Sequence, residues 1–232
     1  MRAKGETFTE VMGFLGVIPI FSTLSEASCR LLAHESHFKH IERGEILFFQ
    51  HDPSESAFVV RAGNISIILN SSDGREMVIN EMHRGDLFGE LGILTHRSRS
   101  TSAIARTKSE LLVIPGPAFL QVVDREPQFA LRMLELTANR LQMSGKRESA
   151  LAFLDAQARL ARLLLELEEQ EKDKGYVTIS QDELAHHTGL IRQTVAKALG
   201  KWRRSGWLIT GRGRILILNR KALEELENNL LI

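Results

Sequence analysis

The sequence is poor in cysteine, in long apolar runs and in net charge. Its single cysteine, Cys29, excludes an internal disulfide framework, a thiolate cluster and a zinc site built from cysteines within one chain. Apolar runs such as 163–165 and 215–218 are far too short to span a membrane, and the amino-terminal segment carries acidic residues and lacks a cleavage signature. The sequence therefore predicts a cytoplasmic protein without a membrane segment. A net charge of +1 names no partner.

One long segment has no acidic residue. Between Arg192 and Lys221 there are nine Lys or Arg residues and no Asp or Glu, although acidic residues are plentiful on both sides. Otherwise the composition is that of an ordinary globular protein, since 43% of the 232 residues are hydrophobic and 25% are charged. This length and composition predict two domains with a connector, of which the carboxyl-terminal domain is locally basic.

The first half of the chain, from about residue 14 to 114, consists of short β-rich runs such as EILFFQ, AFVVRAG, ISIILN, EMVINEM and ELLVI. Turn signals separate these runs at 51–56, at 62–64 and at 71–74, where the sequence Ser-Ser-Asp-Gly is typical of a hairpin. Short strands at this spacing predict an all-β barrel or sandwich-like roll. Ser25 is placed to cap a helix over 25–36.

A long helix is predicted from 127 to 154, where there is no further Pro and only one Gly. Such a helix, about 40 Å long at 1.5 Å per residue, is too long to be buried against one small roll. One stripe of it contains Ala130, Met133, Thr137, Leu141, Ser144 and Leu151. Two interpretations remain open: a helical seam between two chains, or a helix that lies back on its own domain.

The segment 85–105, GDLFGELGILTHRSRSTSAIA, suits a bound sugar phosphate. Gly89 and Gly92 let the backbone approach a ligand closely. Glu90 can accept hydrogen bonds from a ribose hydroxyl, and the planar fork of Arg99 matches phosphate oxygens. Further hydroxyl donors follow at Ser100 and Thr101. The alternative is a Gly-rich surface loop with a solvated glutamate and arginine.

The basic carboxyl-terminal segment has the spacing of a helix-turn-helix. Asp155 can cap a helix over 156–169, and a second start signal follows at Ser180, where a capping box with Glu183 opens a short helix that Gly189 ends. The next helix is expected over 192–204. The two helices would pack through Leu184, Ala185, Leu190, Val195 and Leu199.

Four side chains would project from the front of the second helix toward a major groove. Arg192 can pair bidentately with a guanine edge, and Gln193 can pair with adenine or accept from cytosine. Thr194 and Lys197 can hold phosphates. A β-hairpin over 207–218, with basic residues at its tip, would form a wing that grips the DNA backbone. The alternative is a basic face that is merely solvated.

Catalytic and metal-binding patterns are weak. His186 and His187 are adjacent, so on a helix they point about 100° apart and do not converge on one ion. Ser, His and Asp residues are abundant, but none stands in a nucleophile-elbow or zincin motif. An enzyme, or an adaptor that does not bind DNA, is the remaining alternative.

Three motifs in order resemble the catabolite activator (CRP/FNR) family of bacterial transcription regulators. The motif F-G-E-L-G-I-L, followed by Arg99-Ser100, resembles the phosphate-binding cassette of cyclic-nucleotide domains. RLQMSGKRESALAFLD, at 140–155, resembles that family's dimerisation-helix end and hinge, and GLIRQTVAKAL, at 189–199, resembles its recognition helix. The resemblance implies an α+β protein: a jelly-roll-like cyclic-nucleotide-binding β-roll over 1–126, a dimerisation helix and hinge over 127–154, and a winged helix-turn-helix domain over 155–232.

The resemblance also implies roles for single residues. Glu90 would bind the ribose 2′-hydroxyl, Arg99 and Ser100 the cyclic phosphate, and Ser144 the adenine amino group. The implied ligand set is Ile67, Ile79, Gly89, Glu90, Leu91, Arg99, Ser100, Thr101, Arg140, Ser144 and Gly145. The implied DNA-binding set is Ser180, Gln181, Ile191, Arg192, Gln193, Thr194, Lys197, Arg212 and Arg214.

Three positions depart from the family's pattern. Thr101 stands where many members have alanine, and Gln193 replaces a glutamate, so the expected operator differs at one base pair per half-site. Gly145 stands where a serine or asparagine is expected to reach across from the second subunit. Because of Gly145, cyclic GMP, a cyclic dinucleotide or no effector remain alternatives to cyclic AMP.

The resemblance therefore implies a homodimeric regulator that binds cyclic AMP in the roll and a palindromic operator in double-stranded DNA. RNA polymerase is a further implied partner. No metal is implied, because members that sense redox use an iron-sulfur cluster that Cys29 alone cannot hold.

Overall fold

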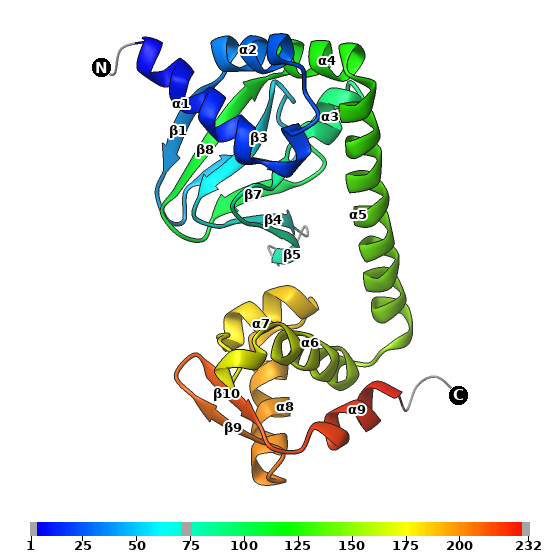
Figure 1. Cartoon of the computed structure of the whole chain (residues 1–232). Coiled ribbons are helices and arrows are strands. Elements are labelled where there is room, and N and C mark those ends of the chain that lie inside the picture. Colours follow the sequence, from blue (N-terminus) through cyan, green and yellow to red (C-terminus); the bar gives the residue numbers. More distant parts are fainter. Residues whose placement is uncertain (1–3, 71–75, 229–232) are drawn as a thin grey trace. The chain divides into compact units, whose positions relative to one another are not determined.

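The computed structural model describes residues 4–70 and 76–228, with side chains omitted at 4–7, 151–153 and 228. The hairpin signal expected at 71–74 lies outside the described residues. The chain forms two compact units, the first ending at Asn139 and the second continuing from Arg140. Both residues lie in one long helix, and the predicted three-part division after residues 126 and 154 stays a prediction (Figure 1).

The first unit is a β-roll with flanking helices (Figure 1). Its helices are α1 (Lys4–Val17), a 3-10 turn (Pro19–Phe21), α2 (Glu26–Glu35), α3 (Glu90–Leu94), α4 (Gly116–Arg125) and the start of α5 (Pro127–Phe153). Its strands are β1 (His37–Ile41), β2 (Ile46–Phe48), β3 (Ser56–Ala62), β4 (Ile65–Asn70), β5 (Glu76–Met82), β6 (Leu87–Phe88), β7 (Ser102–Ala105) and β8 (Ser109–Pro115).

The strands form two four-stranded sheets, in the orders β1-β8-β3-β6 and β2-β7-β4-β5. The first sheet is buried on both faces, as β3 shows: Ala57 and Val59 pack under the helices, whereas Phe58 and Val60 point into the roll. In antiparallel register, Phe58 lies opposite Val113 of β8. Successive residues of a strand point to opposite faces, so this sheet separates a helix-covered core from the interior of the roll.

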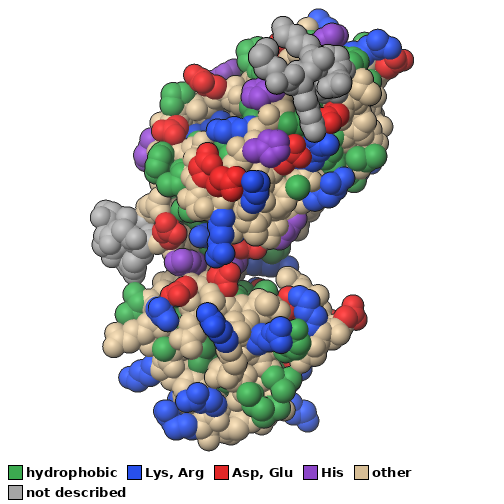
Figure 2. Space-filling view, turned by 90° about the vertical axis from the view of Figure 1, so that its left-hand side faces the viewer, with side chains coloured by type: hydrophobic (Ala, Val, Ile, Leu, Met, Phe, Trp, Pro, Cys, Tyr) green, Lys and Arg blue, Asp and Glu red, His purple; other side chains and the backbone are tan. Residues whose placement is uncertain are grey.

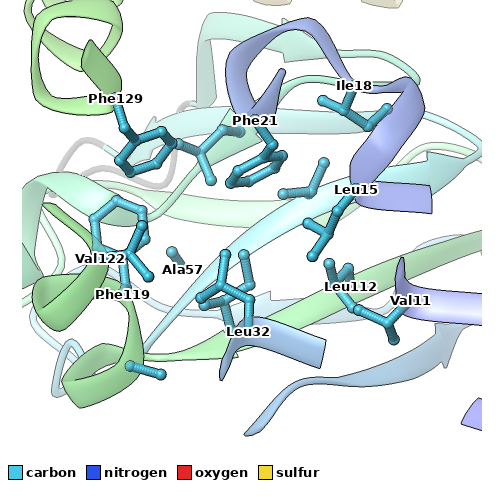
Figure 3. Close-up of a cluster of buried hydrophobic side chains, with 14 of the residues drawn as sticks. Val11, Leu15, Ile18, Phe21, Leu32, Ala57, Leu112, Phe119, Val122 and Phe129 are labelled. Atoms are coloured by element: carbon cyan, nitrogen blue, oxygen red, sulfur yellow. The ribbon is translucent and has the colours of Figure 1, made fainter. Parts of the chain in front are cut away.

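The helix-covered core gathers side chains from α1, α2, α4 and the beginning of α5 (Figure 3). Phe129 of α5 stacks on Phe21, with ring centroids 5.6 Å apart, and meets Phe119 of α4 edge-on at 5.9 Å. These aromatic contacts attach the first turns of α5 to the roll.

Helix α1 corrects the sequence analysis, which began the β-rich region at about residue 14. Phe14 lies in α1 and is buried with Val11, Leu15 and Ile18. These positions have the three- and four-residue spacing of one helix face, and Pro19 follows directly, so a helical signal was available in the apolar run.

The long helix expected over 127–154 is α5, and its predicted stripe divides in two. Met133 is buried in the core of its own unit, so this part of the helix does lie back on its own domain. Leu141, another member of the stripe, is exposed, and of the other α5 side chains that the structure describes, Leu131, Leu134 and Met143 are large, apolar and exposed as well. An exposed apolar face therefore includes part of the predicted stripe and extends beyond it.

The second unit is a winged helix-turn-helix fold. It contains α6 (Ala156–Gln170), a 3-10 turn (Lys172–Lys174), α7 (Gln181–Thr188), α8 (Arg192–Arg204), β9 (Leu208–Gly211), β10 (Arg214–Ile217) and α9 (Arg220–Asn228). Trp202 of α8 is fully buried at its centre and stacks against Trp207. Four of the five predicted packing residues are buried there, and Leu190 is partly buried against them. In the described part of the chain, no helix combines the length and apolar character needed to cross a bilayer.

Candidate functional sites

The guanidinium of Arg99 lies inside the β-roll. Arg99 is only 5% exposed. Its Nη1 donates a hydrogen bond to the carbonyl oxygen of Gly89 at 2.5 Å, and its Nη2 donates one to the carbonyl oxygen of Ser56 at 2.7 Å. The group also lies 4.3 Å from the ring centroid of Phe48 and 5.4 Å from that of Phe58. Its buried Nε has no hydrogen-bond partner among the residues that the structure describes.

The electrostatics around Arg99 are those of a partly compensated buried cation. Burial lowers the pKa of the Arg99 guanidinium, and the carboxylates of Glu90, Asp52 and Glu55 oppose that shift. An arginine remains protonated in proteins even so, because its ordinary pKa lies far above neutral pH. The roll therefore holds a positive charge that water barely reaches.

A left-handed glycine brings the segment at Glu90 close to Arg99. Gly89 caps α3 with a φ of +76°, a conformation that side chains disfavour. A Cβ atom at this position would lie 2.8 Å from Nη1 of Arg99 and 3.1 Å from the ring of Phe58. Glu90, the first residue of α3, is buried next to this contact. The fold thus brings the Glu90 segment and Arg99, which the sequence predicts as a pair, close together.

The other predicted ligand residues of the roll are distributed around this centre. Ile67 of β4 is buried in the interior cluster that contains Phe48 and Phe58, and Ile79 of β5 is partly buried against the same cluster. Leu91 and Ser100 are exposed, and Thr101 is partly exposed. A hollow of about 680 Å³ lies between 51–55, 92–98 and 116–120; Gly92 lines it, but Glu90 and Arg99 do not.

Three predicted ligand residues lie beyond Asn139, where the first unit ends. Arg140, Ser144 and Gly145 all belong to α5, and the hydroxyl of Ser144 donates to Oε1 of Glu148, one turn away, at 3.2 Å. Apart from its neighbours in the helix, no atom of the described residues would lie within 4 Å of a Cβ at Gly145. These residues are placed on the helix and are not assigned a position relative to the roll.

The predicted helix-turn-helix is present with its predicted caps. The hydroxyl of Ser180 accepts from the Glu183 backbone, and the Glu183 carboxylate accepts from the Ser180 backbone N–H at 2.7 Å. Gly189 ends α7 in the left-handed conformation, with a φ of +67°. Ile191 is the N-cap of α8. The α8 residues Arg192, Gln193 and Lys197 are exposed, Thr194 is partly exposed, and Gln181 opens α7.

The hairpin β9-β10 carries Arg212 in its turn and Arg214 at the start of β10. The guanidinium of Arg214 lies 4.8 Å from the ring centroid of Tyr176, and Arg212 is exposed. Lys and Arg side chains are spread over the face of this second unit that Figure 2 shows, with few Asp or Glu side chains between them. The sequence therefore folds into a basic surface formed by a helix and a wing.

Some neighbours of these side chains were missed in the sequence. Phe48, Phe58 and the Ser56 carbonyl surround Arg99 only because β2, β3 and the segment before β7 meet in the fold. No local signal identifies that meeting. Asp182, by contrast, stands between Ser180 and Glu183 of the capping box, so its place in the first turn of α7 can be read from the sequence. Its ion pair with Arg192, 3.3 Å from Oδ1 to Nε, joins two helices and has no such local signal.

No group of three or more His, Cys, Asp or Glu side chains among the described residues is arranged to hold a metal ion. Cys29 lies half-buried in α2, and burial raises the pKa of its thiol, with Glu126 and Glu26 raising it further. A thiol with a raised pKa is less ionised at neutral pH and therefore less reactive.

Two domain families match the chain, one in each unit. The family "Cyclic nucleotide-binding domain" matches residues 38–126, and the family "Crp-like helix-turn-helix domain" matches residues 158–226. Among relatives, the cAMP-activated global transcriptional regulator CRP of Salmonella typhimurium is 28% identical over 178 residues, which cover 74% of this chain and 84% of that protein.

Two further comparisons extend over more of the length. The CRP-like cAMP-activated global transcriptional regulator of Mycobacterium tuberculosis is 27% identical over 210 residues, covering 88% of this chain and 94% of that protein. The c-di-GMP responsive global regulator CLP of Xanthomonas campestris has a similar structure, with a TM-score of 0.75 at 24% identity, covering 83% of this chain and 99% of that one.

Proposed function

Since the chain belongs to the CRP/FNR family of transcription regulators, which are not enzymes, we propose that it is a cyclic-AMP-responsive homodimer. It would bind cyclic AMP in the roll and a palindromic site in double-stranded DNA through α8 and the wing. That the protein acts in the cytoplasm and contacts RNA polymerase are further predictions.

The observation that carries the nucleotide proposal is the buried guanidinium of Arg99. Two protein carbonyls use one N–H each of Nη1 and Nη2, although the group has five N–H donors, and its Nε has no partner among the described residues. A cyclic phosphate would supply both the missing acceptor and the missing negative charge. Glu90, buried next to Arg99, would accept from the ribose hydroxyl.

The DNA proposal is supported by the exposed side chains on the N-terminal part of α8. Arg192, Gln193 and Lys197 are exposed there, and α8 has no acidic residue in its first turn. Ser180, Gln181, Thr194 and the wing residues Arg212 and Arg214 would contact phosphates, whereas Ile191 would make apolar contacts.

A titration with a matched pair of arginine variants tests the nucleotide proposal. Binding of the full chain to operator DNA is followed at fixed salt while cyclic AMP is added, for the wild type, Arg99→Ala and Arg97→Ala. Arg97 is an exposed arginine two residues away, so it controls for the loss of charge. We expect cyclic AMP to raise DNA affinity in the wild type and Arg97→Ala only. DNA binding that ignores cyclic AMP in all three proteins would refute the ligand while leaving the DNA-binding function intact.

A second candidate effector is a different cyclic nucleotide, and Gly145 favours it. Gly145 offers no side-chain donor or acceptor to a purine, and the structurally similar CLP is described as c-di-GMP responsive. Competition between cyclic AMP, cyclic GMP and c-di-GMP for the purified protein separates these candidates. A preference of tenfold or more, roughly 1.4 kcal/mol, for one of them would identify the effector.

A further inference from the structure

An acidic residue lies beside the first residue of the basic helix. Asp182, the second residue of α7, places Oδ1 3.3 Å from Nε of Arg192, which begins α8. Their side chains are 56% and 69% exposed, so neither is held by burial. Both line a hollow of about 170 Å³ together with Gly211 and Gly213 of the wing. This ion pair therefore stands at the point where helix and wing meet.

The capping of α7 does not explain where Asp182 points. Ser180 and Glu183 already complete a reciprocal capping box, so the α7 start has its side-chain acceptor. An acid in the first turn is favoured by the helix dipole, which accounts for an Asp at position 182. It does not account for a carboxylate directed at the α8 arginine.

The position is also electrostatically unfavourable for a DNA-binding surface. The segment 192–221 has no acidic residue, as expected for a surface that neutralises phosphates. A carboxylate next to this surface repels the same phosphates. We therefore expect the carboxylate beside Arg192 to have a role that offsets this repulsion.

We propose that Asp182 is a positioning residue that fixes how Arg192 reads DNA, an inference that rests on the DNA-binding function proposed above. With Nε held on the Asp182 side, the two Nη groups of Arg192 point away from the carboxylate. That end of the fork matches O6 and N7 of a guanine. Asp182 thus makes Arg192 selective for guanine rather than a mobile cation that also accepts phosphates.

The effect belongs to the bound state. An exposed ion pair contributes little to the stability of the free protein, because water screens it and two side chains lose freedom. In a DNA groove from which water is excluded, the same attraction is stronger. Base preference, rather than thermal stability, is therefore the readout that reports the role.

The experiment uses the full-length protein and randomised double-stranded DNA, with and without cyclic AMP. Selection on the wild type gives the preferred site, and the base pair whose preference disappears in Arg192→Ala is the one that Arg192 reads. Affinities for the four versions of that base pair are then measured for wild type, Asp182→Ala, Asp182→Asn and Asp182→Ala combined with Arg192→Ala. Asp173→Asn, an exposed acid of the same unit, controls for net charge.

We expect the wild type to discriminate roughly tenfold to a hundredfold at that base pair, as good bidentate contacts do. Asp182→Ala should reduce the discrimination to a few-fold there and nowhere else, while its affinity for unrelated DNA rises. Asp182→Asn keeps an oxygen acceptor and should retain most of the discrimination. In the Arg192→Ala background, Asp182→Ala should change base preference no further.

Unchanged discrimination in Asp182→Ala, with Arg192→Ala still impaired, overturns the positioning role and leaves DNA reading intact. A loss that persists in the Arg192→Ala background also overturns it, because Asp182 then does not act through Arg192. A wild type that binds every sequence equally would instead overturn the proposed sequence-specific function, and the inference with it.

Discussion

At the residue scale, Arg99 shows how a roll can keep a cation away from water. Two aromatic faces and two carbonyl oxygens surround the guanidinium, and each such contact stabilises the charge without neutralising it. Complete neutralisation by a protein carboxylate would compete with an anionic ligand. Partial compensation therefore suits a phosphate site better than a closed ion pair does.

Gly89 gives a first prediction, because two separate constraints apply to it. Gly89→Ala should cost about 1–2 kcal/mol of unfolding free energy, since φ is +76°. Its Cβ would also displace the Arg99 guanidinium, so we expect cyclic AMP affinity to fall about tenfold or more, the scale of one charge-assisted hydrogen bond. Denaturant unfolding and calorimetric titration measure the two effects.

Gly44→Ala is the matched control, with a φ of +83° and no atom within 4 Å of its Cβ. It should lose a similar amount of stability and keep its nucleotide affinity. Equal nucleotide affinity in both variants would contradict the proposed contact between the Gly89 segment and the phosphate-binding arginine.

Gly145 gives a second prediction, in the direction of gained function. Gly145→Ser should fit, since its Cβ meets nothing within 4 Å, and it supplies a hydroxyl where the family resemblance expects one. If that hydroxyl meets the adenine amino group, the ratio of cyclic AMP to cyclic GMP affinity should rise about two- to tenfold, the value of one hydrogen bond. Gly145→Ala separates the hydroxyl from the helix-stabilising methyl group. A ratio that stays constant in the serine variant would argue against the assigned position.

At the scale of elements, the end of α4 is attached to the start of α2. Oε1 of Glu126, which separates α4 from α5, accepts hydrogen bonds from the backbone N–H of Ser25 at 3.2 Å, from its hydroxyl, and from the hydroxyl of Ser28 at 2.5 Å. These bonds hold the pKa of the Glu126 carboxyl below its ordinary value, with the Ser25 and Ser28 hydroxyls the largest causes. The carboxylate also lies at the positive end of α2.

A pH-dependent stability follows from this contact. A carboxyl whose pKa is lowered by folding contributes stability above its unfolded pKa, and that contribution disappears as the pH falls through the lowered folded pKa. Ser28→Ala should therefore lower the midpoint temperature of unfolding at pH 7. The difference from wild type should vanish well below pH 4.5, which is the ordinary pKa of a glutamate side chain. Thermal unfolding across this range measures it.

The hydroxyl of Ser22 provides the comparison, because it donates to the carbonyl oxygen of Pro19 at 2.7 Å rather than to a carboxylate. Ser22→Ala should lower the midpoint by the same amount at every pH. A pH-independent loss in Ser28→Ala as well would show that Glu126 is not the group responsible.

The elements differ in how far their sequences determine them. The bounds of α7 were predictable because caps act within four residues: the Ser180 box and the left-handed Gly189 need no tertiary information. Helix α1 was missed because its apolar run fits a strand as well as a helix, and α9 was not predicted. The carbonyls and rings around Arg99 come from segments far apart in the sequence and from both sheets, so the packing of the two sheets, which no local pattern encodes, decides their positions.

At the scale of the whole molecule, the proposed switch sets a requirement on the nucleotide. Moving a population from 1:99 to 99:1 needs about 5.5 kcal/mol of differential binding, or roughly 2.7 kcal/mol for each of two sites in a dimer. Each site must then favour the active arrangement about a hundredfold. Such a preference is within reach of a buried guanidinium that gains charge-assisted hydrogen bonds in one arrangement only.

The dimer that this mechanism needs gives the last prediction. Leu134 and Leu141 on α5 are 65% and 71% exposed, and they lie seven residues apart, so they share one face of the helix. Large exposed apolar side chains in register favour pairing with a second copy of the helix.

Leu141→Glu should shift the protein from dimer to monomer in analytical ultracentrifugation, because it would bury an unpaired carboxylate in the seam. Gln142→Glu adds the same charge one position round the helix and should leave the dimer intact. With two recognition helices no longer held together, the monomer should bind a palindromic site about as weakly as a single half-site. A Leu141→Glu protein that remains a dimer would move the interface off this face, and α8 would need another means of spacing its two copies one DNA turn apart.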